Sequence, residues 1–204
     1  MKLDRSEVAR YLGYGSRPLE PEVEALVTRC EEQFFATAKP RQLGRRLSLS
    51  ELPVSSNELS QHLRNCEDAW LIVVTLGSEM DRLLRVWAAQ NMGMAAVGQA
   101  MAAVWMDACC DAYLQELEQR LSPGEYLLPP YSPGYGDFSL SHQKTLLSLL
   151  DAGRRIGVSL TQGGMLVPEK TVTAVVGITK APTERCVQSC HACQKKDCKF
   201  RKGS

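Results

Sequence analysis

The chain has 204 residues, of which 44% are hydrophobic and 23% are charged. This composition excludes a disordered or fibrous protein and is ordinary for a single globular domain or a small two-lobed one. A chain of this length buries about 70% of the surface that its unfolded form exposes, so it needs neither disulfides nor metal to form a core. Its eight cysteines therefore require another explanation.

The formal net charge of +1 conceals an uneven distribution. Residues 185–202 carry six basic residues and one acidic residue, a net +5, which leaves 18 basic and 22 acidic residues, a net −4, elsewhere. The first residues run directly into charged helical sequence without an apolar signal segment, which predicts a cytoplasmic, reducing location. The longest uncharged apolar stretch, residues 92–106, is shorter than the roughly 20 residues that span a bilayer, and it predicts a buried helix.

The first part of the chain predicts helices followed by one buried strand. Helical spacing of apolar residues is found in residues 5–12, 20–38 and 57–64. Residues 42–52 alternate weakly and favour one or two strands. Residues 69–76 are continuously apolar and rich in β-branched side chains, and Gly77 ends the run. This pattern is typical of a strand buried on both faces, so we expect it to be the central strand.

Two helices are predicted after this strand. Ser78 with Asp81 three residues later resembles a capping box, which predicts a helix from residue 79 to about residue 90. A longer helix is predicted over residues 92–121, where the apolar stripe contains many small residues. Small residues on a stripe predict close packing against neighbouring helices.

The last elements complete the predicted fold class. Residues 139–150 predict a helix that is closed by Ala152 and Gly153. Residues 156–160 and 172–178 alternate between apolar and other side chains and predict two strands. Helices mixed with strands that do not repeat in a regular order predict an α+β fold.

A loop rich in proline and glycine, residues 127–137, is the first candidate for function. Its three prolines and two glycines fix the backbone and place Tyr131 and Tyr135 in a segment rich in turns. One interpretation is a structural connector. The other is a preformed groove for a small planar ligand, with backbone donors and Tyr135 as a wall.

Asp107 is the second candidate, because it is the only charged residue in residues 92–110. A buried carboxylate there would have to be paired or serve a ligand, because desolvating it alone costs several kcal/mol. The alternative is that the helix turns Asp107 outward to solvent. The neighbouring Cys109 and Cys110 are predicted to be core thiols.

The third candidate is a cluster of four cysteines near the C-terminus, Cys186, Cys190, Cys193 and Cys198. In a reducing compartment this density favours metal binding over disulfides. Four thiolates suit zinc or an iron–sulfur cluster, and the spacing of the cysteines does not decide between them. A redox-active tail is the alternative, and His191 is interpreted as a neighbour rather than a ligand.

Several segments, taken together, carry a resemblance to a known family. They are residues 131–137, 140–143, 156–161 and 171–174 with Met165 and Pro168, preceded by residues 10–14 and 75–77 and the long helix with its acidic residue. In order and spacing they resemble the activation domain of cobalamin-dependent methionine synthase. The resemblance covers roughly residues 5–180, and the motifs are specific as a set rather than singly.

The resemblance implies a fold and a ligand. The fold would be a C-shaped α+β domain, residues 1–180, with helices flanking a twisted, mainly antiparallel sheet, followed by a basic, cysteine-rich tail, residues 181–204. The family domain binds S-adenosylmethionine and presents its methyl group to oxidised cobalamin during reduction. Residues at the corresponding ligand positions are Ser132, Pro133, Gly134 and Tyr135, with Asp107 where the family has a glutamate.

Two positions depart from the family pattern. Pro130 stands five residues before Tyr135, where the family has an arginine suited to clamping the ligand's carboxylate, and Val176 stands near the place of a second tyrosine. Two hypotheses follow.

The first hypothesis is a reactivation factor that binds S-adenosylmethionine and supports reductive methylation of cobalamin held by a separate methionine synthase or other corrinoid protein. The second is a non-catalytic scaffold that has lost S-adenosylmethionine and docks on a corrinoid protein through a metal-bound tail. An iron–sulfur cluster in the tail could deliver an electron, whereas zinc could only fold or dock it. We expect no membrane partner, and the few aromatic residues in the basic tail make a nucleic-acid partner the weakest alternative.

Overall fold

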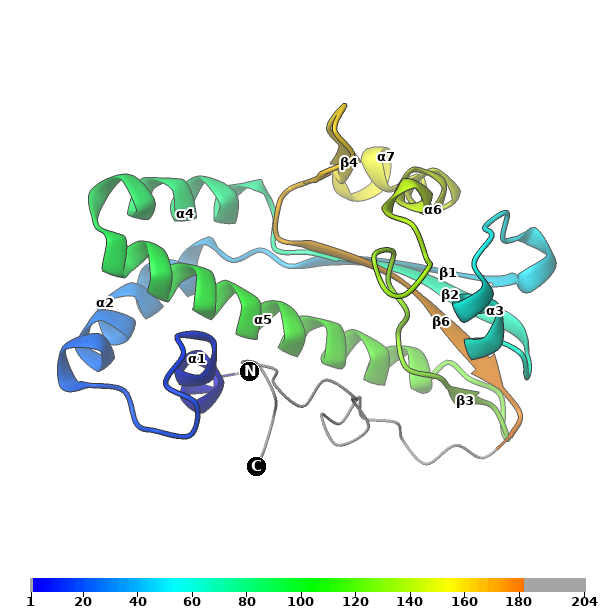
Figure 1. Ribbon diagram of the computed structural model, residues 1–204, viewed down its shortest axis with the longest axis horizontal. Coiled ribbons are helices and arrows are strands. Elements are labelled where there is room, and N and C mark those ends of the chain that lie inside the picture. Colours follow the sequence, from blue (N-terminus) through cyan, green and yellow to red (C-terminus); the bar gives the residue numbers. More distant parts are fainter. Residues whose placement is uncertain (1, 182–204) are drawn as a thin grey trace.

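The computed structural model describes residues 2–181, and Figure 1 shows how their helices and strands are arranged. The helices are α1 (Arg5–Tyr11), α2 (Pro21–Thr37), α3 (Asn57–His62), α4 (Ser78–Gln90), α5 (Met92–Glu118), α6 (Gln143–Leu150) and α7 (Ala152–Ile156), with 3₁₀ turns at Leu49–Glu51 and Leu140–His142. The strands are β1 (Arg41–Ser48), β2 (Cys66–Thr75), β3 (Tyr126–Leu127), β4 (Ser159–Leu160), β5 (Leu166–Val167) and β6 (Thr171–Thr179).

Four strands form one sheet in the order β1-β2-β6-β3, and each neighbouring pair is antiparallel. The predicted central strand is β2, which lies between β1 and β6 and pairs Val73 with Leu43 on one side and Thr173 on the other. The short β4 and β5 pair with each other as a separate hairpin. Helices flanking a mainly antiparallel sheet confirm the predicted α+β class.

The sheet separates two hydrophobic cores (Figure 1). Helices α1, α2, α4 and α5 pack on the face that carries Val74 and Val176. Helices α3, α6 and α7 pack on the opposite face, which carries Val73 and Val175. Successive residues of β2 and β6 thus serve alternate cores, which confirms that the central strand is buried on both faces.

Helices α4 and α5 form a tightly packed hairpin around Asn91. The Asn91 side chain accepts a hydrogen bond from the Met94 backbone N–H at 3.1 Å and caps α5. A Cβ atom at Gly98 would come within 2.6 Å of the Trp87 ring, so only glycine fits where the helices meet. The predicted close packing of small residues is confirmed. Within residues 2–181, no helix combines the length and apolar character needed to cross a membrane.

The capping box predicted at Ser78 is wrong. Ser78 is the first residue of α4, and the N-cap is Gly77, whose φ of 90° is a conformation that favours glycine. Asp81 points elsewhere: its carboxylate accepts hydrogen bonds from the backbone N–H groups of Glu169 at 2.7 Å and Lys170 at 3.4 Å. Asp81 therefore ties α4 to the segment before β6 instead of capping its own helix.

The strand predicted over residues 156–160 is largely wrong. Residues 152–156 form α7, and only Ser159–Leu160 are extended. The predicted helix does end at Leu150, with Asp151 in the left-handed conformation, but Ala152 and Gly153 begin α7 and do not close the preceding helix. Ala152 and Ile156, one helical turn apart, are both buried against the sheet, and this contact decides the local structure.

A charged cluster at Arg46 predicts a pH dependence of stability. The Arg46 guanidinium donates to Asp68 and to Glu125, each at 2.7 Å, and so joins β1, β2 and the turn before β3. These bonds from Arg46, with one from the Ser122 N–H, lower the pKa of Glu125 from 4.5 to about 2. A carboxyl whose pKa is lowered by folding stabilises the protein at pH values above its pKa in the unfolded chain. This stabilisation is lost as the pH falls toward the folded-state pKa of about 2.

We expect Glu125→Gln to flatten the fall in urea-unfolding free energy between pH 5 and pH 3, because the variant has no proton to take up at this position. Glu67→Gln, at a side chain that is 85% exposed, is the matched control. An unchanged pH profile in the Glu125 variant, relative to the wild type, would show that this cluster does not set the acid limit of the fold.

Candidate ligand-binding site

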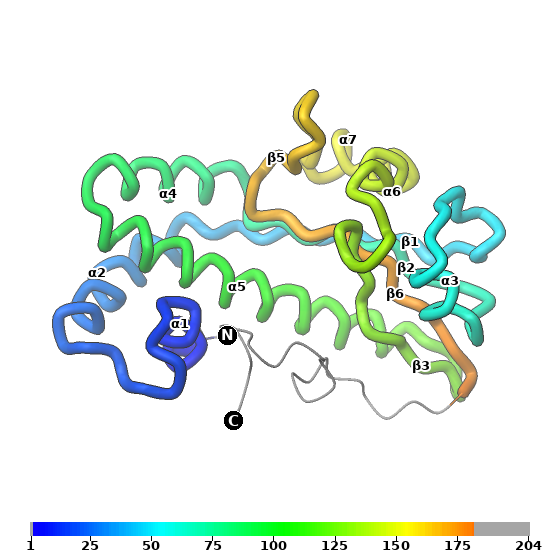
Figure 2. Tube along the Cα trace, viewed as in Figure 1, coloured from blue at the N-terminus to red at the C-terminus, as the bar shows by residue number. Residues whose placement is uncertain are grey.

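The chain between β3 and α6 runs along the outer edge of β6 (Figure 2). The Leu128 N–H donates to the Gly177 carbonyl at 2.8 Å, and Tyr131 exchanges two backbone hydrogen bonds with Val175 at 2.8 and 2.9 Å. Continuing this antiparallel ladder would place Pro133 opposite Thr173. Proline has no N–H to donate, so the ladder stops and the chain leaves the sheet.

Two consecutive turns follow the end of the ladder. The Tyr135 N–H donates to the Ser132 carbonyl at 3.1 Å, with Pro133 and Gly134 as the central residues and a φ of 101° at Gly134. Proline followed by a glycine of positive φ is the pattern of a type II turn. The second turn is closed by the Phe138 N–H, which donates to the Tyr135 carbonyl at 2.9 Å. These hydrogen bonds fix the backbone of the loop, as its prolines and glycines predict.

Aromatic rings support the loop from beneath. Tyr131 lies 5.2 Å from the His62 ring, 5.8 Å from the Tyr135 ring and 6.2 Å from the Phe138 ring, measured between centroids. Phe138 is fully buried and stacks on His142 at 5.3 Å. Tyr135, in contrast, is 50% exposed and meets Tyr131 edge-on. One tyrosine ring is thus held in place while remaining accessible to a ligand.

Asp137 fastens the loop to α3. Its carboxylate accepts hydrogen bonds from the Asn57 N–H at 2.8 Å, the Glu58 N–H at 3.2 Å and the Ser56 hydroxyl. The Ser56 and Asn57 bonds lower the pKa of Asp137. The Tyr131 hydroxyl donates to Glu58 at 3.1 Å, which gives the loop a second attachment to the same helix. Sequence reasoning missed Asp137, because its partners lie about eighty positions earlier in the chain.

Asp107 takes the outward position of its two alternatives. It is exposed on α5, and its carboxylate accepts a hydrogen bond from the Tyr11 hydroxyl of α1 at 3.0 Å. Burial, and secondarily the Asp107 charge, raise the pKa of Tyr11. Cys109 is buried and Cys110 is half-buried, and burial raises their pKa values to about 11 and about 12. Both thiols pack with the core, as predicted.

The predicted ligand residues are only partly brought together. Ser132, Pro133, Gly134 and Tyr135 form one turn. Asp107 belongs to the helix on one face of the sheet, and among residues 2–181 no hydrogen bond joins it to that turn. Val176 is fully buried in the core between the sheet and helices α1, α2, α4 and α5, and Pro130 is half-buried.

The predicted metal ligands, Cys186, Cys190, Cys193 and Cys198, lie outside the described residues. Between residues 2 and 181, no group of three or more histidine, cysteine or acidic side chains is arranged to hold a metal ion.

Comparisons with known proteins give a similarity of fold. No protein-family model and no curated protein matches this chain. Among solved structures, the chain is similar to a crystal structure of the MetH reactivation domain bound to AdoHcy, with a TM-score of 0.58 and 14% sequence identity. The match covers 87% of this chain and 77% of that chain. At this identity the similarity shows the fold alone, and that fold is the one implied by the resemblance found in the sequence.

Proposed function

We propose that this protein binds S-adenosylmethionine at the Ser132–Tyr135 turn and supports reactivation of a separate cobalamin-binding protein. The observation that carries the proposal is a hydrogen-bonded turn with an exposed tyrosine at the edge of the sheet. The domain that contains it has a fold similar to that of a reactivation domain crystallised with AdoHcy. S-Adenosylmethionine shares most of its structure with AdoHcy, so a site of this shape would serve both.

The residues of the turn suit parts of this ligand. The exposed Tyr135 ring offers a face for adenine stacking or for the sulfonium cation. The exposed Asp107 carboxylate would favour the ligand's positive groups if the ligand reaches across to α5. Pro130 and Val176 supply neither a charge-assisted clamp nor a second ring, so we expect affinity about tenfold to a hundredfold weaker for each missing contact.

The protein's part in such a reaction is to position rather than to react. S-Adenosylmethionine supplies the methyl group, and the cobalamin of a corrinoid protein accepts it after reduction. The turn would orient the methyl donor, while the fixed backbone of the loop limits its motion. The transfer needs no nucleophile or acid–base pair from the protein, and we see none in the turn.

We further propose that residues 181–204 form a separate basic tail in which Cys186, Cys190, Cys193 and Cys198 bind zinc or an iron–sulfur cluster. The density of thiols and the surrounding basic residues support this assignment.

The test is calorimetric titration with S-adenosylmethionine and, separately, AdoHcy, on protein purified without oxygen. Metal content and visible absorption are recorded on the same sample to test the tail. We expect saturable binding with a dissociation constant below about 1 mM, weakened at least about tenfold by Tyr135→Ala and largely kept by Tyr135→Phe. Tyr126→Ala, which removes a tyrosine that is 39% exposed in β3, is the matched control.

Two outcomes would contradict the assignment. One is the absence of binding at several millimolar ligand, and the other is binding that Tyr135→Ala leaves unchanged. Absence of ligand binding, combined with retained binding to a corrinoid protein, would support the scaffold hypothesis, whereas binding that Tyr135→Ala leaves unchanged would place the ligand elsewhere on the protein.

A further inference from the structure

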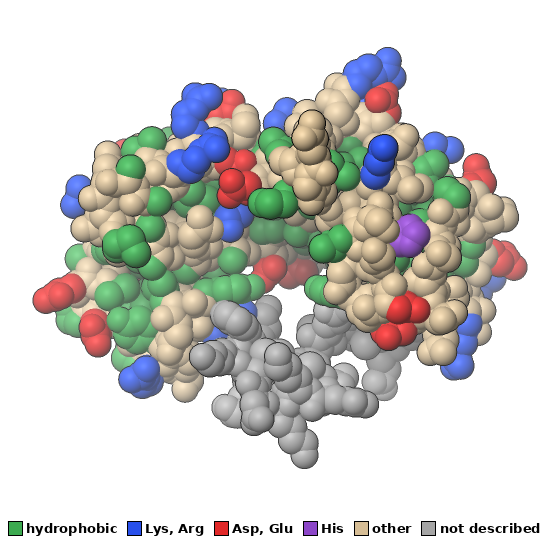
Figure 3. All heavy atoms as spheres, turned by 45° about the horizontal axis from the view of Figure 1, so that its top comes forward, with side chains coloured by type: hydrophobic (Ala, Val, Ile, Leu, Met, Phe, Trp, Pro, Cys, Tyr) green, Lys and Arg blue, Asp and Glu red, His purple; other side chains and the backbone are tan. Residues whose placement is uncertain are grey.

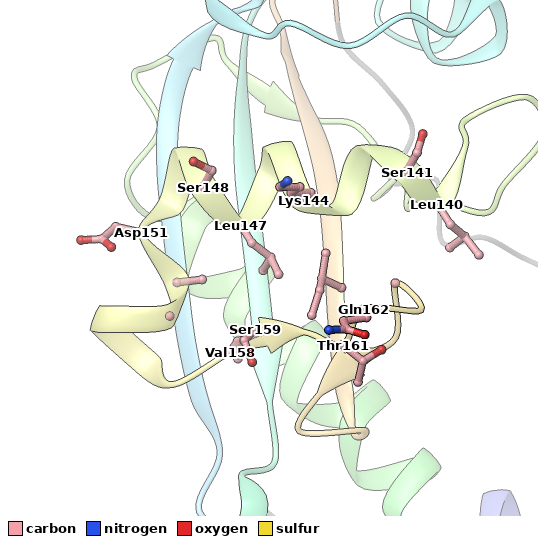
Figure 4. A pocket seen from close by; sticks show the side chains of 14 residues that line it. Leu140, Ser141, Lys144, Leu147, Ser148, Asp151, Val158, Ser159, Thr161 and Gln162 are labelled. Carbon is pink, nitrogen blue, oxygen red and sulfur yellow. The ribbon is translucent and has the colours of Figure 1, made fainter.

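A groove of about 690 Å³ lies between α6 and the β4–β5 hairpin (Figure 4). This volume is in the range of ligand-binding clefts. Its walls come from residues 140–153 on one side and residues 158–164 on the other. The Ser132–Tyr135 turn and Asp107 do not line it, but the groove adjoins the turn at Leu140, whose side chain lies next to Gly134.

The groove is elongated. Leu140 and Asp151 mark its two ends along the helical wall (Figure 4). The 3₁₀ turn and α6 between them rise by about 17 Å in total. An extended peptide advances about 3.3 Å per residue, so about five residues would lie along this wall. These dimensions favour an extended chain over a compact ligand.

The hairpin presents an unpaired strand edge to the groove. The Thr161 N–H donates to the Met165 carbonyl at 2.9 Å, and Leu160 pairs with Leu166. Because antiparallel residues alternate between facing the partner strand and facing away, the Leu160 N–H and C=O point away from β5. Leu160 lines the groove and Leu166 does not, so this edge faces α6. Within the described part of the chain, neither group has a hydrogen-bond partner.

Apolar side chains surround this edge. Leu147 and Val158 are 7% and 1% exposed and form the floor, and Leu147 points toward the hairpin (Figure 4). Leu140 at one end is 58% exposed, and Met165, next to Gly164 at the hairpin tip, is 64% exposed. Figure 3 shows hydrophobic side chains at the surface with basic ones among them. Exposed apolar side chains gathered around a groove are typical of an interaction site.

One exposed cation stands on the wall of the groove. Lys144 lies on the helical wall, is exposed, and has no acidic partner within 4.0 Å among residues 2–181. The one carboxylate on the walls, Asp151, points away from the groove and is paired with Arg154 at 2.6 Å (Figure 4). An acidic side chain in the groove would therefore meet a cation that has no other partner.

We propose that this groove binds an extended segment of a partner protein, which adds to β4 as a third strand and alternates apolar with acidic residues. Backbone hydrogen bonds to Leu160 would hold the segment, as in other complexes formed by strand addition. Apolar side chains on one face of the segment would pack on Leu147 and Val158, and acidic side chains on the other face would lie near Lys144. The proposal concerns a protein partner and does not depend on binding of S-adenosylmethionine.

The probe is a fluorescent five-residue peptide in which valine and glutamate alternate, titrated with the full chain by fluorescence polarisation. We expect saturable binding with a dissociation constant below about 1 mM. A peptide N-methylated at its central residues should bind at least about tenfold more weakly, because it cannot donate to the strand edge. The amide signal of Leu160 should shift in nitrogen–proton correlation spectra of the complex.

Charge reversal tests the cation. Lys144→Glu should weaken binding of the glutamate peptide about tenfold and improve binding of a peptide with lysine at the same positions. Lys180→Glu, at a lysine that is 75% exposed and paired with Glu67, is the matched control and should leave both affinities within about twofold.

Three results would overturn the proposal: no saturable binding of either peptide, binding insensitive to both N-methylation and Lys144→Glu, or shifts confined to residues outside the groove. Both substituted lysines are exposed, and the N-methylated peptide is tested on the unchanged protein, so misfolding of a variant cannot mimic the expected pattern.

Discussion

Replacing Phe138 with alanine is expected to lower the free energy of unfolding by about 3–5 kcal/mol. Phe138 is fully buried in the core beneath α6, stacks on His142, and supports Tyr131. Removing the ring leaves a cavity in that core and also removes the support beneath the candidate ligand loop. Because domains are stable by only about 5–15 kcal/mol, this one change would remove a large part of the total.

The measurement is urea unfolding at neutral pH, with the slope of the transition checked for two-state behaviour. Phe35→Ala is the control, because Phe35 is a half-buried ring that meets Trp105 at 4.8 Å on the opposite face of the sheet. We expect a clearly smaller loss there. A loss below about 1 kcal/mol at Phe138 would show that this ring contributes little to the core beneath α6.

Hydrogen exchange separates the two consequences of the Phe138 change. The Tyr135 and Phe138 amides donate within the turns and should exchange slowly in the wild type. If Phe138 fixes the loop, these amides should exchange faster in the variant even at urea concentrations where the sheet stays folded. Amides of β2 would report the global loss alone.

The elements that sequence reasoning found are those with a strong local signal. A strand that faces two cores must be apolar at successive positions, and residues 69–76 show this continuously, so β2 was predictable. The Ser132–Tyr135 turn was predictable because proline followed by glycine has few conformations available. The long stripe of small residues in α5 likewise predicted close packing, which Gly98 provides.

The elements that sequence reasoning missed depend on contacts between distant residues. In residues 152–160, apolar side chains stand at spacings that fit a helix and a strand equally well. Burial of Ala152 and Ile156 against the sheet favours the helical conformation, which forms α7. The two-residue β3 exists only because β6 offers it an edge. The attachment of Asp137 to α3 likewise follows from the tertiary fold, since neither segment carries a local signal for the other.

Asp81 is the clearest case of a residue whose local signal misleads. Its position three residues after Ser78 suggests a capping box, yet its side chain is buried and receives the backbone N–H groups of Glu169 and Lys170. The Lys170 carbonyl in turn accepts from the Leu76 N–H at 2.9 Å. Asp81 and β2 thus hold the segment before β6 from two sides.

We expect Asp81→Ala to lower the free energy of unfolding by about 2 kcal/mol, because a charged acceptor is lost and two backbone donors are left without their partner. Asp81→Asn keeps one acceptor oxygen and should lose about half as much. Glu32→Ala, at an exposed acidic residue on α2, should change stability by less than about 0.5 kcal/mol.

Hydrogen exchange at residues 169 and 170 locates the effect of the Asp81 change. If the carboxylate holds this segment, these two amides should exchange faster in Asp81→Ala, and those of β6 beyond Thr173 should change only as the global stability changes. Because the same segment leads from the β4–β5 hairpin into β6, its loosening should also weaken peptide binding in the groove while leaving the Ser132–Tyr135 turn intact. A variant that lost stability with no faster exchange at residues 169 and 170 would place the contribution of Asp81 within α4 itself.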